Sequence, residues 1–378
     1  MTNALRWIMV VLLAGHGLIH LLGAAKGFGW ADVEQLRQPI GTGAAVLWLL
    51  ASVLVLTAAA LLATGAPTWW WGAALTAAAL SQLAIGTSWS DAKAGTIINV
   101  LLVLSAAYAF ASVGPTSFHA QWDQRAAQAL SEAIPAGPAV TDTDLADLPE
   151  PLAAYVRHSG AVGKPTVTSF QADVHGKIRS GPDAAWMPFT GKQVNTYGPR
   201  PTRAFIIDAT RSGLPVTVLH LYDDATATMR AKLLSVATVV DAAGPEMDRA
   251  ETVTVFNDLV VFAPGAIVDA PVQWTAIDAS HVQGVYTAGN QSVTAVLTFN
   301  ADHDLVDFVS QDRFRASADG TTFDPQGWST PLAAYQDAEG YRVPTAGEGR
   351  WSAPEPEGTF TYIEFHLDDI HYNVHSTL

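Results

Sequence analysis

The sequence predicts an α+β protein: a four-helix transmembrane bundle followed by a large curved antiparallel β-sheet, half-barrel-like, with one or two packed helices. Three observations predict this class. Four apolar runs occupy the first 113 residues, runs rich in β-branched and aromatic residues recur after Lys164, and one helical segment interrupts them. Because no βαβ repeat occurs, a doubly wound parallel sheet is not expected.

The four apolar runs predict membrane-spanning helices. Each has 20–21 residues, and at about 1.5 Å per residue a helix of that length crosses a hydrocarbon core of roughly 30 Å. Arg6, at the edge of the first run, is the only Lys, Arg, Asp or Glu in any of them. Three runs follow the first, so a cleaved signal peptide is not expected. The predicted spans, within a domain of residues 1–113, are 5–25, 43–63, 68–88 and 94–113.

The basic residues between these spans predict an orientation. Lys26, Arg37 and Lys93 lie in the first and third loops, whereas the opposite side has only Arg6. Loops rich in Lys and Arg favour the cytoplasm, and with four spans both chain ends then lie outside. We therefore expect an integral protein of the cell membrane with an extracytoplasmic C-terminal domain.

Polar side chains inside the spans form a second feature. His16 and His20 are four residues apart and share a helix face, and Gln82 and Asn99 lie on later spans. His20, Gln82 and Asn99 fall at one depth, roughly 6–8 Å from the bilayer centre at 1.5 Å per residue. One interpretation is an intramembrane site for a proton, a metal or a head group. The other is hydrogen bonding between helices with neutral histidines.

Charge and composition exclude several function classes. The residues after Val113 contain 16 basic and 32 acidic side chains, and so acidic a domain repels phosphate backbones, which excludes nucleic acid as a partner. The chain has no cysteine, which removes disulfides, thiol nucleophiles and cysteine-ligated metal centres.

Residues 114–147 predict an amphipathic helix, Ser117–Ile134, and a linker, and residues 148–378 predict an antiparallel β domain. Ten to twelve strands follow one another through short turns, which is typical of hairpins. The helical interruption is Glu246–Val260. A meander of this size must curl or close, and a curved sheet around that helix would leave an apolar cavity.

Several motifs resemble an uncharacterised bacterial membrane-protein family, known as a domain of unknown function. The motifs are Trp186-Met187-Pro188-Phe189, the run Glu251–Asp258, Gln311-Asp312-Arg313 and, in the membrane part, His16-Gly17-Leu18-Ile19-His20. The resemblance covers nearly the whole chain and implies no activity. A second, shorter pattern, Tyr335 followed by Gly340–Thr345, is similar to extracytoplasmic lipoprotein carriers (Lol-type half-barrels). That likeness implies a curved sheet that holds acyl chains.

The densest polar group of the β domain lies on and near the interrupting helix. Glu251 and Asp258 are two turns apart and share a face. One hypothesis places them at a cavity mouth, with Arg313 binding an anionic head group through two hydrogen bonds. The alternative is that Arg313 pairs with one of these carboxylates and pins the helix to the sheet. The candidate ligand-binding residues are Trp186, Phe189, Glu251, Asn257, Asp258 and Arg313.

No catalytic residue, metal site or cofactor is predicted. Nucleophile-elbow, zinc-protease and nucleotide-binding motifs do not occur. Three histidines, His366, His371 and His375, cluster near the C-terminus, but on a regular strand His366 and His371 would point to opposite faces.

The first functional hypothesis is a non-catalytic, membrane-anchored extracytoplasmic protein that binds a lipid or another apolar small molecule. Its partners would be the bilayer and that ligand; the sequence identifies no protein partner. One alternative is a small membrane redox or proton-handling module that uses His16 and His20 and has a regulatory β domain. The other is a membrane scaffold.

Overall fold

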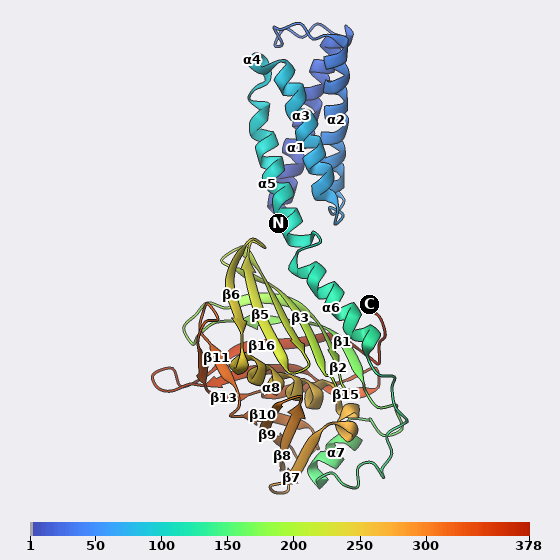
Figure 1. Cartoon of the computed structure of the whole chain (residues 1–378), viewed down its shortest axis with the longest axis vertical. Helices are drawn as coiled ribbons and strands as arrows, with labels where there is room; N and C mark the ends of the chain where they lie inside the picture. The colour runs from blue at the N-terminus through green and yellow to red at the C-terminus, as the bar shows by residue number, and fades with distance from the viewer. Residues whose placement is uncertain (1–2) are drawn as a thin grey trace. The chain divides into compact units, whose positions relative to one another are not determined.

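A computed structural model describes residues 3–378. The chain divides into two compact units, Met1–Ala120 and Gln121–Leu378. The first unit is helical and the second is built around a large sheet (Figure 1).

The helical unit packs through small residues. Its helices are α1 (Asn3–Phe28), α2 (Thr42–Ala63), α3 (Trp70–Thr87), α4 (Trp89–Ala92) and α5 (Gly95–Val113). A Cβ atom added at Gly23 of α1 would lie 2.3 Å from the Trp48 ring of α2. Helices that meet in a membrane commonly use glycine and alanine for such close approach, and alanine is the most frequent buried residue of both α2 and α3.

The expectation of four membrane spans is corrected to three. The helices that are long and apolar enough to cross a membrane lie within Ala4–Phe28, Thr42–Ala63 and Gly95–Glu132. The expected span at residues 68–88 is the helix α3, which packs against α2 and α5. This helix begins only at Trp70, and its Trp, Thr, Ser and Gln residues lower its mean hydropathy.

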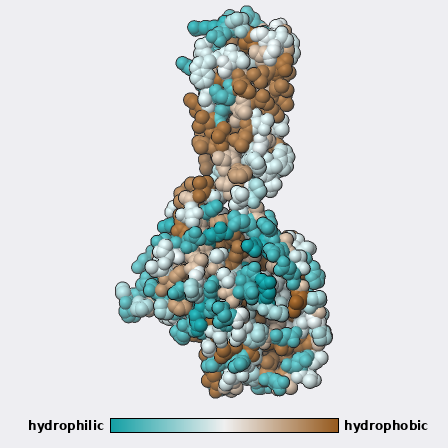
Figure 2. Space-filling view, viewed as in Figure 1, coloured by the Kyte–Doolittle hydropathy of each residue, from teal (hydrophilic) through white to brown (hydrophobic). Residues whose placement is uncertain are grey.

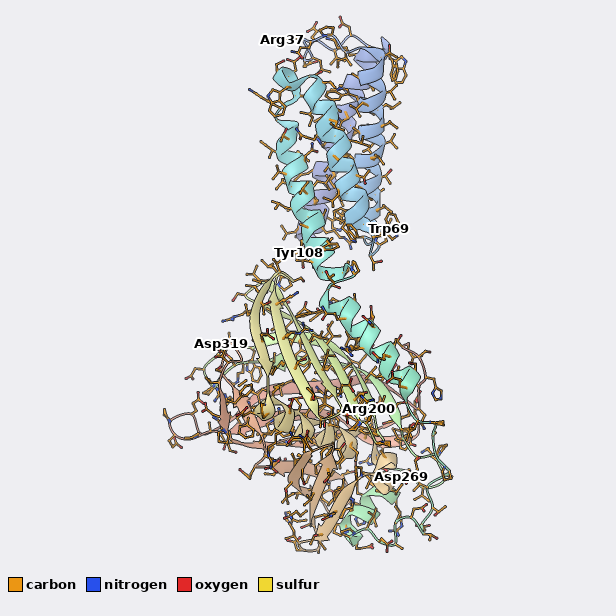
Figure 3. All side chains as sticks on the ribbon, in the orientation of Figure 1. Arg37, Trp69, Tyr108, Arg200, Asp269 and Asp319 are labelled. Carbon is orange, nitrogen blue, oxygen red and sulfur yellow. The ribbon has the colours of Figure 1, made fainter. Side chains whose placement is uncertain are left out.

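The surfaces of the two units differ in polarity. Figure 2 shows hydrophobic residues in broad brown areas on the helical unit, whereas hydrophilic residues dominate the visible face of the β domain. Within the helical unit, Arg37 and Trp69 lie at opposite ends of the bundle (Figure 3). The loop with Arg37 lies at the same end as α4 (Figure 1), as expected if the basic loops share one side.

The β domain contains one 14-stranded antiparallel sheet and one small two-stranded sheet. The strands of the first half are β1 (Ser169–Ile178), β2 (Met187–Thr196), β3 (Thr202–Arg211), β4 (Leu214–Asp223), β5 (Thr226–Leu233) and β6 (Ala237–Ala243). Those of the second half are β7 (Val272–Ala276), β8 (His281–Ala288), β9 (Gln291–Phe299), β10 (Leu305–Ser310), β11 (Phe314–Ala316), β12 (Phe323–Pro325), β13 (Gly327–Ser329), β14 (Leu332–Ala338), β15 (Tyr341–Ser352) and β16 (Thr359–Tyr372).

The large sheet joins two meanders at its centre. Its order is β6-β5-β4-β3-β2-β1-β16-β15-β13-β10-β9-β8-β7, and β14 pairs with β15. The last strand therefore pairs with the first, while β6 and β7 remain as edges, so the sheet is open. This arrangement confirms a large antiparallel sheet and fits a half-barrel.

The helix α8 (Pro245–Phe262) connects the two edge strands through the inside of the sheet, followed by the 3₁₀ helix η1 (Pro264–Asp269). Gly244, with φ of 110°, and Pro245 begin the helix, as is common for residues that start helices. Of its 18 residues, 13 are buried. A helix that is buried on all sides belongs to the core of its domain, and α8 fills most of the concave space that the sequence led us to expect as a cavity.

The strand boundaries differ from the expectation at several places. The sequence pattern predicts one strand over Lys192–Tyr197 and another over Leu305–Arg315. In the structure the first of these, β2, begins at Met187, and the second is broken into β10 and β11. The edge strand β6 was not expected, because most of its residues are exposed and lack an alternating apolar pattern. Two short helices complete the domain: α6 (Phe118–Glu132) and α7 (Glu150–His158).

The amphipathic helix α6 packs on the outside of the sheet. Nε1 of Trp122 donates a hydrogen bond to the carbonyl oxygen of Ala204 at 3.1 Å, and Arg230 donates to the Gln121 side chain at 2.7 Å. The apolar positions that predicted this helix therefore face strands β3 to β5.

Candidate functional site

Buried charges join α8 to both halves of the sheet. On one side, Nη1 of Arg313 lies 2.8 Å from Oε1 of Glu251. On the other, Nε of Arg203, on β3, lies 2.8 Å from Oδ2 of Asp258 and its Nη1 lies 3.7 Å from Oε2 of Glu251. All four side chains are less than 10 % exposed. Two guanidinium groups and two carboxylates thus balance one another inside the domain, as buried charges require.

Neutral polar groups complete this charge cluster. Asp258 also accepts hydrogen bonds from Gln193 at 2.7 Å and from Asn195 at 3.1 Å, both on β2. Asn257 donates to the hydroxyl of Thr330 at 2.7 Å. The guanidinium of Arg313 also lies over the Trp328 ring, 4.6 Å from its centre.

The cluster shifts the protonation of its members. Burial raises the pKa of Glu251, but His220, Arg313 and Arg203 outweigh it and bring the pKa down to about 2. Burial lowers the pKa of His220 to about 4, so this imidazole is neutral at pH 7. Its Nε2 atom lies 3.4 Å from Oε2 of Glu251. For Asp258, burial raises the pKa and the adjacent Arg203 opposes the change.

An apolar surface begins where the charge cluster ends. Seven buried residues of β1 to β5 form this strand-face cluster, and no residue of α8 belongs to it: Val174, Phe189, Phe205, Ile207, Ala209, Val216 and Ala231. Figure 1 shows β5 and β6 continuing well beyond α8. The strand-face cluster therefore lines the part of the half-barrel that the helix leaves uncovered.

A pocket of about 100 Å³ lies between the charge cluster and the strand-face cluster. Val174, Phe189 and Phe205 contribute its apolar side, and Arg203 and Asp258 contribute its polar side. The pocket is therefore larger than the space that a single water molecule needs. It can accept the end of an amphipathic molecule.

The structure brings only some of the expected site residues to this pocket. Phe189, Asn257 and Asp258 line it, whereas Glu251 and Arg313 form the ion pair that joins α8 to the second half of the sheet. Trp186 does not line the pocket; the cations of Lys177 and Arg179 contact its ring, 4.8 Å and 4.4 Å from its centre.

Several lining residues were not anticipated from the sequence. They come from strands far apart in the chain: Gln193, Arg203, Trp328, Tyr362 and Phe365. Only Arg203 could have been noticed in the sequence, because an arginine is rare within an otherwise apolar strand. A larger groove of about 290 Å³ under α6 is lined by charged residues such as Arg125 and Glu132 together with apolar ones such as Leu221.

The helical unit contains a neutral polar cluster. Ser81 lies at its centre, with its hydroxyl oxygen 3.0 Å from Nε2 of His16 and 2.7 Å from Nε2 of His20. The hydroxyl donates to Oδ1 of Asn99 at 2.8 Å, and Asn99 donates to Gln82 at 3.0 Å. The four residues expected at this site therefore do lie together, and Ser81 is the member that sequence reasoning missed.

The C-terminal histidines correct one expectation. His366 pairs with His175 and His371 pairs with Gln171 of β1, with a register shift between them. The shift leaves Asp368 unpaired in a bulge, so His366 and His371 point to the same face rather than to opposite faces. Among residues 3–378, no group of three or more His, Asp or Glu side chains is arranged to hold a metal ion.

Comparison with known proteins places the β domain in a family. Residues 138–365, more than half of the chain, match the model of a family of unknown function, DUF6544. This match confirms the family resemblance seen in the sequence motifs. A comparison with curated protein sequences gave no match.

Three solved structures are similar to this chain at low identity and low TM-score. One is a domain from Vibrio parahaemolyticus described as an outer membrane lipoprotein-sorting protein, with 12% identity, 54% of this chain and 85% of that chain covered, and a TM-score of 0.32. The others are a DUF1329 family protein from Desulfovibrio piger (11% identity, 60% and 92% covered, TM-score 0.33) and a LolA superfamily protein from Nitrosomonas europaea (13% identity, 57% and 91% covered, TM-score 0.32). TM-scores in this range transfer no ligand or activity to this chain.

Proposed function

We propose that this member of the DUF6544 family is a membrane-anchored protein whose β domain binds a lipid or other apolar ligand. The function of the family is unknown, so membership itself assigns no activity to the chain. The observation that carries this proposal is the meeting of the strand-face cluster with the charge cluster at one pocket. An apolar wall opposite fixed hydrogen-bonding groups is the usual composition of a ligand site.

The size of the pocket defines how such a ligand would bind. Typical small-molecule sites occupy about 300–1,000 Å³, so a pocket of about 100 Å³ accommodates only one end of the ligand. The rest would lie along the strand-face cluster. Phe189 and Phe205 belong both to this cluster and to the pocket wall, which makes the two surfaces continuous.

The charge cluster would position the ligand rather than react with it. Its carboxylates and guanidinium groups already neutralise one another, so a neutral head group fits better than a strongly charged one. Arg313 is committed to Glu251, to the Ala250 carbonyl and to the Trp328 ring. We therefore do not assign it the anionic head group that the sequence suggested.

The experiment is extraction of the full-length protein, purified in mild detergent, followed by mass spectrometry of bound lipids. We expect one class of amphiphile in near-stoichiometric amount, and its loss in Val174→Phe, whose ring would fill the pocket. The matched control is Val236→Phe, on an exposed turn where the side chain is 67% exposed. A wild-type protein without bound amphiphile, or a folded Val174→Phe variant that retains it, would contradict the proposal.

We also propose that the β domain lies outside the cytoplasm. In the helical unit, the loop with Lys26 and Arg37 and the end of α4 with Lys93 lie at one end of the bundle (Figure 1). Placing this basic end in the cytoplasm puts the far end of α5, the last candidate span before the β domain, on the opposite side. An enzyme reporter that is active only in the cytoplasm, fused after Leu378, should be inactive. Activity of that fusion would reverse the orientation.

A further inference from the structure

The helical unit contains a pocket of about 320 Å³, larger than the pocket of the β domain. Its wall is formed by helices α1 to α5 and by the loop between α1 and α2. His16, His20 and Trp48 contribute from the helices, and Val33 and Leu36 contribute from the loop. The volume lies within the range of small-molecule sites, about 300–1,000 Å³.

The loop that closes this pocket is held in place from both sides. The Lys26 ammonium donates to the carbonyl oxygens of Val33 and Leu36. Oδ2 of Asp91 accepts the backbone N–H groups of Arg37 and Gln38 at 2.7 Å and 3.0 Å. Lys26 and Asp91, two of the few charged side chains of the helical unit, therefore fix the backbone of the loop that forms one wall of the pocket.

The hydrogen bonds of Ser81 determine what the histidines can offer. Ser81 has one hydroxyl proton and donates it to Oδ1 of Asn99. Its oxygen can therefore only accept from Nε2 of His16 and Nε2 of His20. A neutral imidazole that donates from Nε2 carries a lone pair on Nδ1.

Nδ1 of His20 has no hydrogen-bond partner among the described residues, although the side chain is buried and its ring lines the pocket. A buried acceptor without a donor is unfavourable, because it has lost its hydration without gaining a hydrogen bond. A donor that entered the pocket would remove this cost. His20 is 1% exposed, so its ring must turn slightly toward the pocket to meet such a donor.

The remaining wall selects against charge. Of the residues that line the pocket, none is Lys or Arg, and the one carboxylate, Asp91, is already bonded to the loop. Most of the others are aliphatic or aromatic, such as Trp48, Val33 and Leu36. An anionic head group would find no partner here.

We propose that this pocket binds a neutral, membrane-soluble molecule with a hydroxyl group, and that the hydroxyl donates to Nδ1 of His20. The site is separate from the pocket of the β domain, with which it shares no lining residue. An acceptor buried in an apolar pocket distinguishes an alcohol or a phenol from an ether or a hydrocarbon of the same shape, because only the former donates a proton.

The test is photolabelling of the full-length protein in detergent micelles with a diazirine-bearing octanol, compared with its methyl ether. Labelled peptides are mapped by mass spectrometry. We expect the alcohol to label the segment 30–41 or the peptide with Trp48, at a half-saturating concentration about three- to tenfold below that of the ether, as one neutral hydrogen bond provides. Equal labelling by the two probes, or labelling only outside this wall, would overturn the proposal.

A variant pair locates the effect at His20. His20→Phe should remove the preference for the alcohol while the ether labels as before. Leu83→Phe, whose side chain is 61% exposed on α3, should keep the preference. A His20→Phe protein that still prefers the alcohol would exclude Nδ1 as the acceptor. If this variant does not fold, the comparison of the two probes on the unmodified protein still decides the proposal.

Discussion

The helical unit and the β domain each contain a buried polar cluster that fixes helices in place, but the two clusters consist of different chemical groups. In the helical unit, His16, His20, Ser81, Asn99 and Gln82 connect α1, α3 and α5 through hydrogen bonds between neutral groups. In the β domain, Arg203, Arg313, Glu251 and Asp258 connect α8 to the sheet through full charges. Both clusters hold helices in position, yet only the second uses ion pairs.

The difference follows from what surrounds each cluster. A charge in an apolar bundle has few polar groups nearby to replace its hydration, so neutral partners cost less there. The β domain instead supplies strand side chains such as Gln193 and Asn195, which donate to Asp258. Additional hydrogen bonds of this kind offset the cost of burying a carboxylate. The clusters should therefore respond differently to substitution and to pH.

The largest expected effect is that of Arg313→Met. It leaves Glu251 with less compensation, and removing one partner of a buried ion pair costs about 3–5 kcal/mol. Thermal unfolding of the full-length protein, followed by near-ultraviolet circular dichroism, measures the loss. The control Arg200→Met removes a side chain that is 68% exposed and pairs with Asp223, and should change stability by less than about 1 kcal/mol. Equal losses of stability in the two variants would show that the buried ion pair contributes no more than an exposed one.

The second effect is a pH dependence that only the charge cluster should show. His220 stays neutral in the folded protein down to its pKa of about 4, whereas the unfolded chain binds a proton near 6.5. Stability therefore falls as the pH drops from 6.5 to 4, by about 3 kcal/mol from His220. Glu251 affects stability at lower pH, because its pKa of about 2 in the folded protein lies below the ordinary 4.5. The stability that its carboxylate contributes is lost as the pH falls from 4.5 to 2.

His220→Gln should flatten the stability curve between pH 6.5 and 4, measured as the unfolding temperature at each pH. His375→Gln, on the exposed C-terminal tail, serves as the control and should leave the curve unchanged. If the two variants and the unmodified protein lose stability in parallel, His220 is not the group that titrates.

The smallest effect is expected in the helical unit. Ser81→Ala removes the hydroxyl that contacts both histidines and Asn99, and single hydrogen bonds between membrane helices are worth about 1 kcal/mol. Denaturation of the full-length protein in sodium dodecyl sulfate measures this loss. Thr76→Ala, on the same helix, removes a hydroxyl that bonds only to the Gly72 carbonyl of its own helix and should have almost no effect. A Ser81→Ala loss as large as that of Arg313→Met would mean that the neutral cluster is the stronger one.

The sequence predicted the helices and strands in which apolar residues recur at regular intervals. The apolar runs gave helices near their observed limits, and Glu246–Val260 differs from α8 by one residue at its start and two at its end. Strands β6, β12 and β13 were not predicted, because they are too short or too exposed to show a regular apolar pattern. Helix α3 was taken as a span because its alanines are apolar, although its polar residues lower its hydropathy.

The candidate sites were predictable only in part. Spacing placed His16 near His20, and depth placed both near Gln82 and Asn99, because helix geometry is known in advance. Ser81 was not predicted as a member of this cluster, because serine is common in membrane helices and its presence alone indicates no site. Arg203 escaped because its partner, Asp258, lies 55 residues away, and no local pattern pairs a strand with a distant helix.

By itself, the sequence determined the class of the protein: apolar helices, an acidic antiparallel sheet with one buried helix, and no cysteine chemistry. These features depend on composition and on short periods along the chain. Only the tertiary structure decided which carboxylate pairs with which arginine, that α8 fills most of the concave face, and that the larger pocket lies among the helices. Such outcomes depend on contacts between residues far apart in the chain, and on how completely side chains fill the space between them.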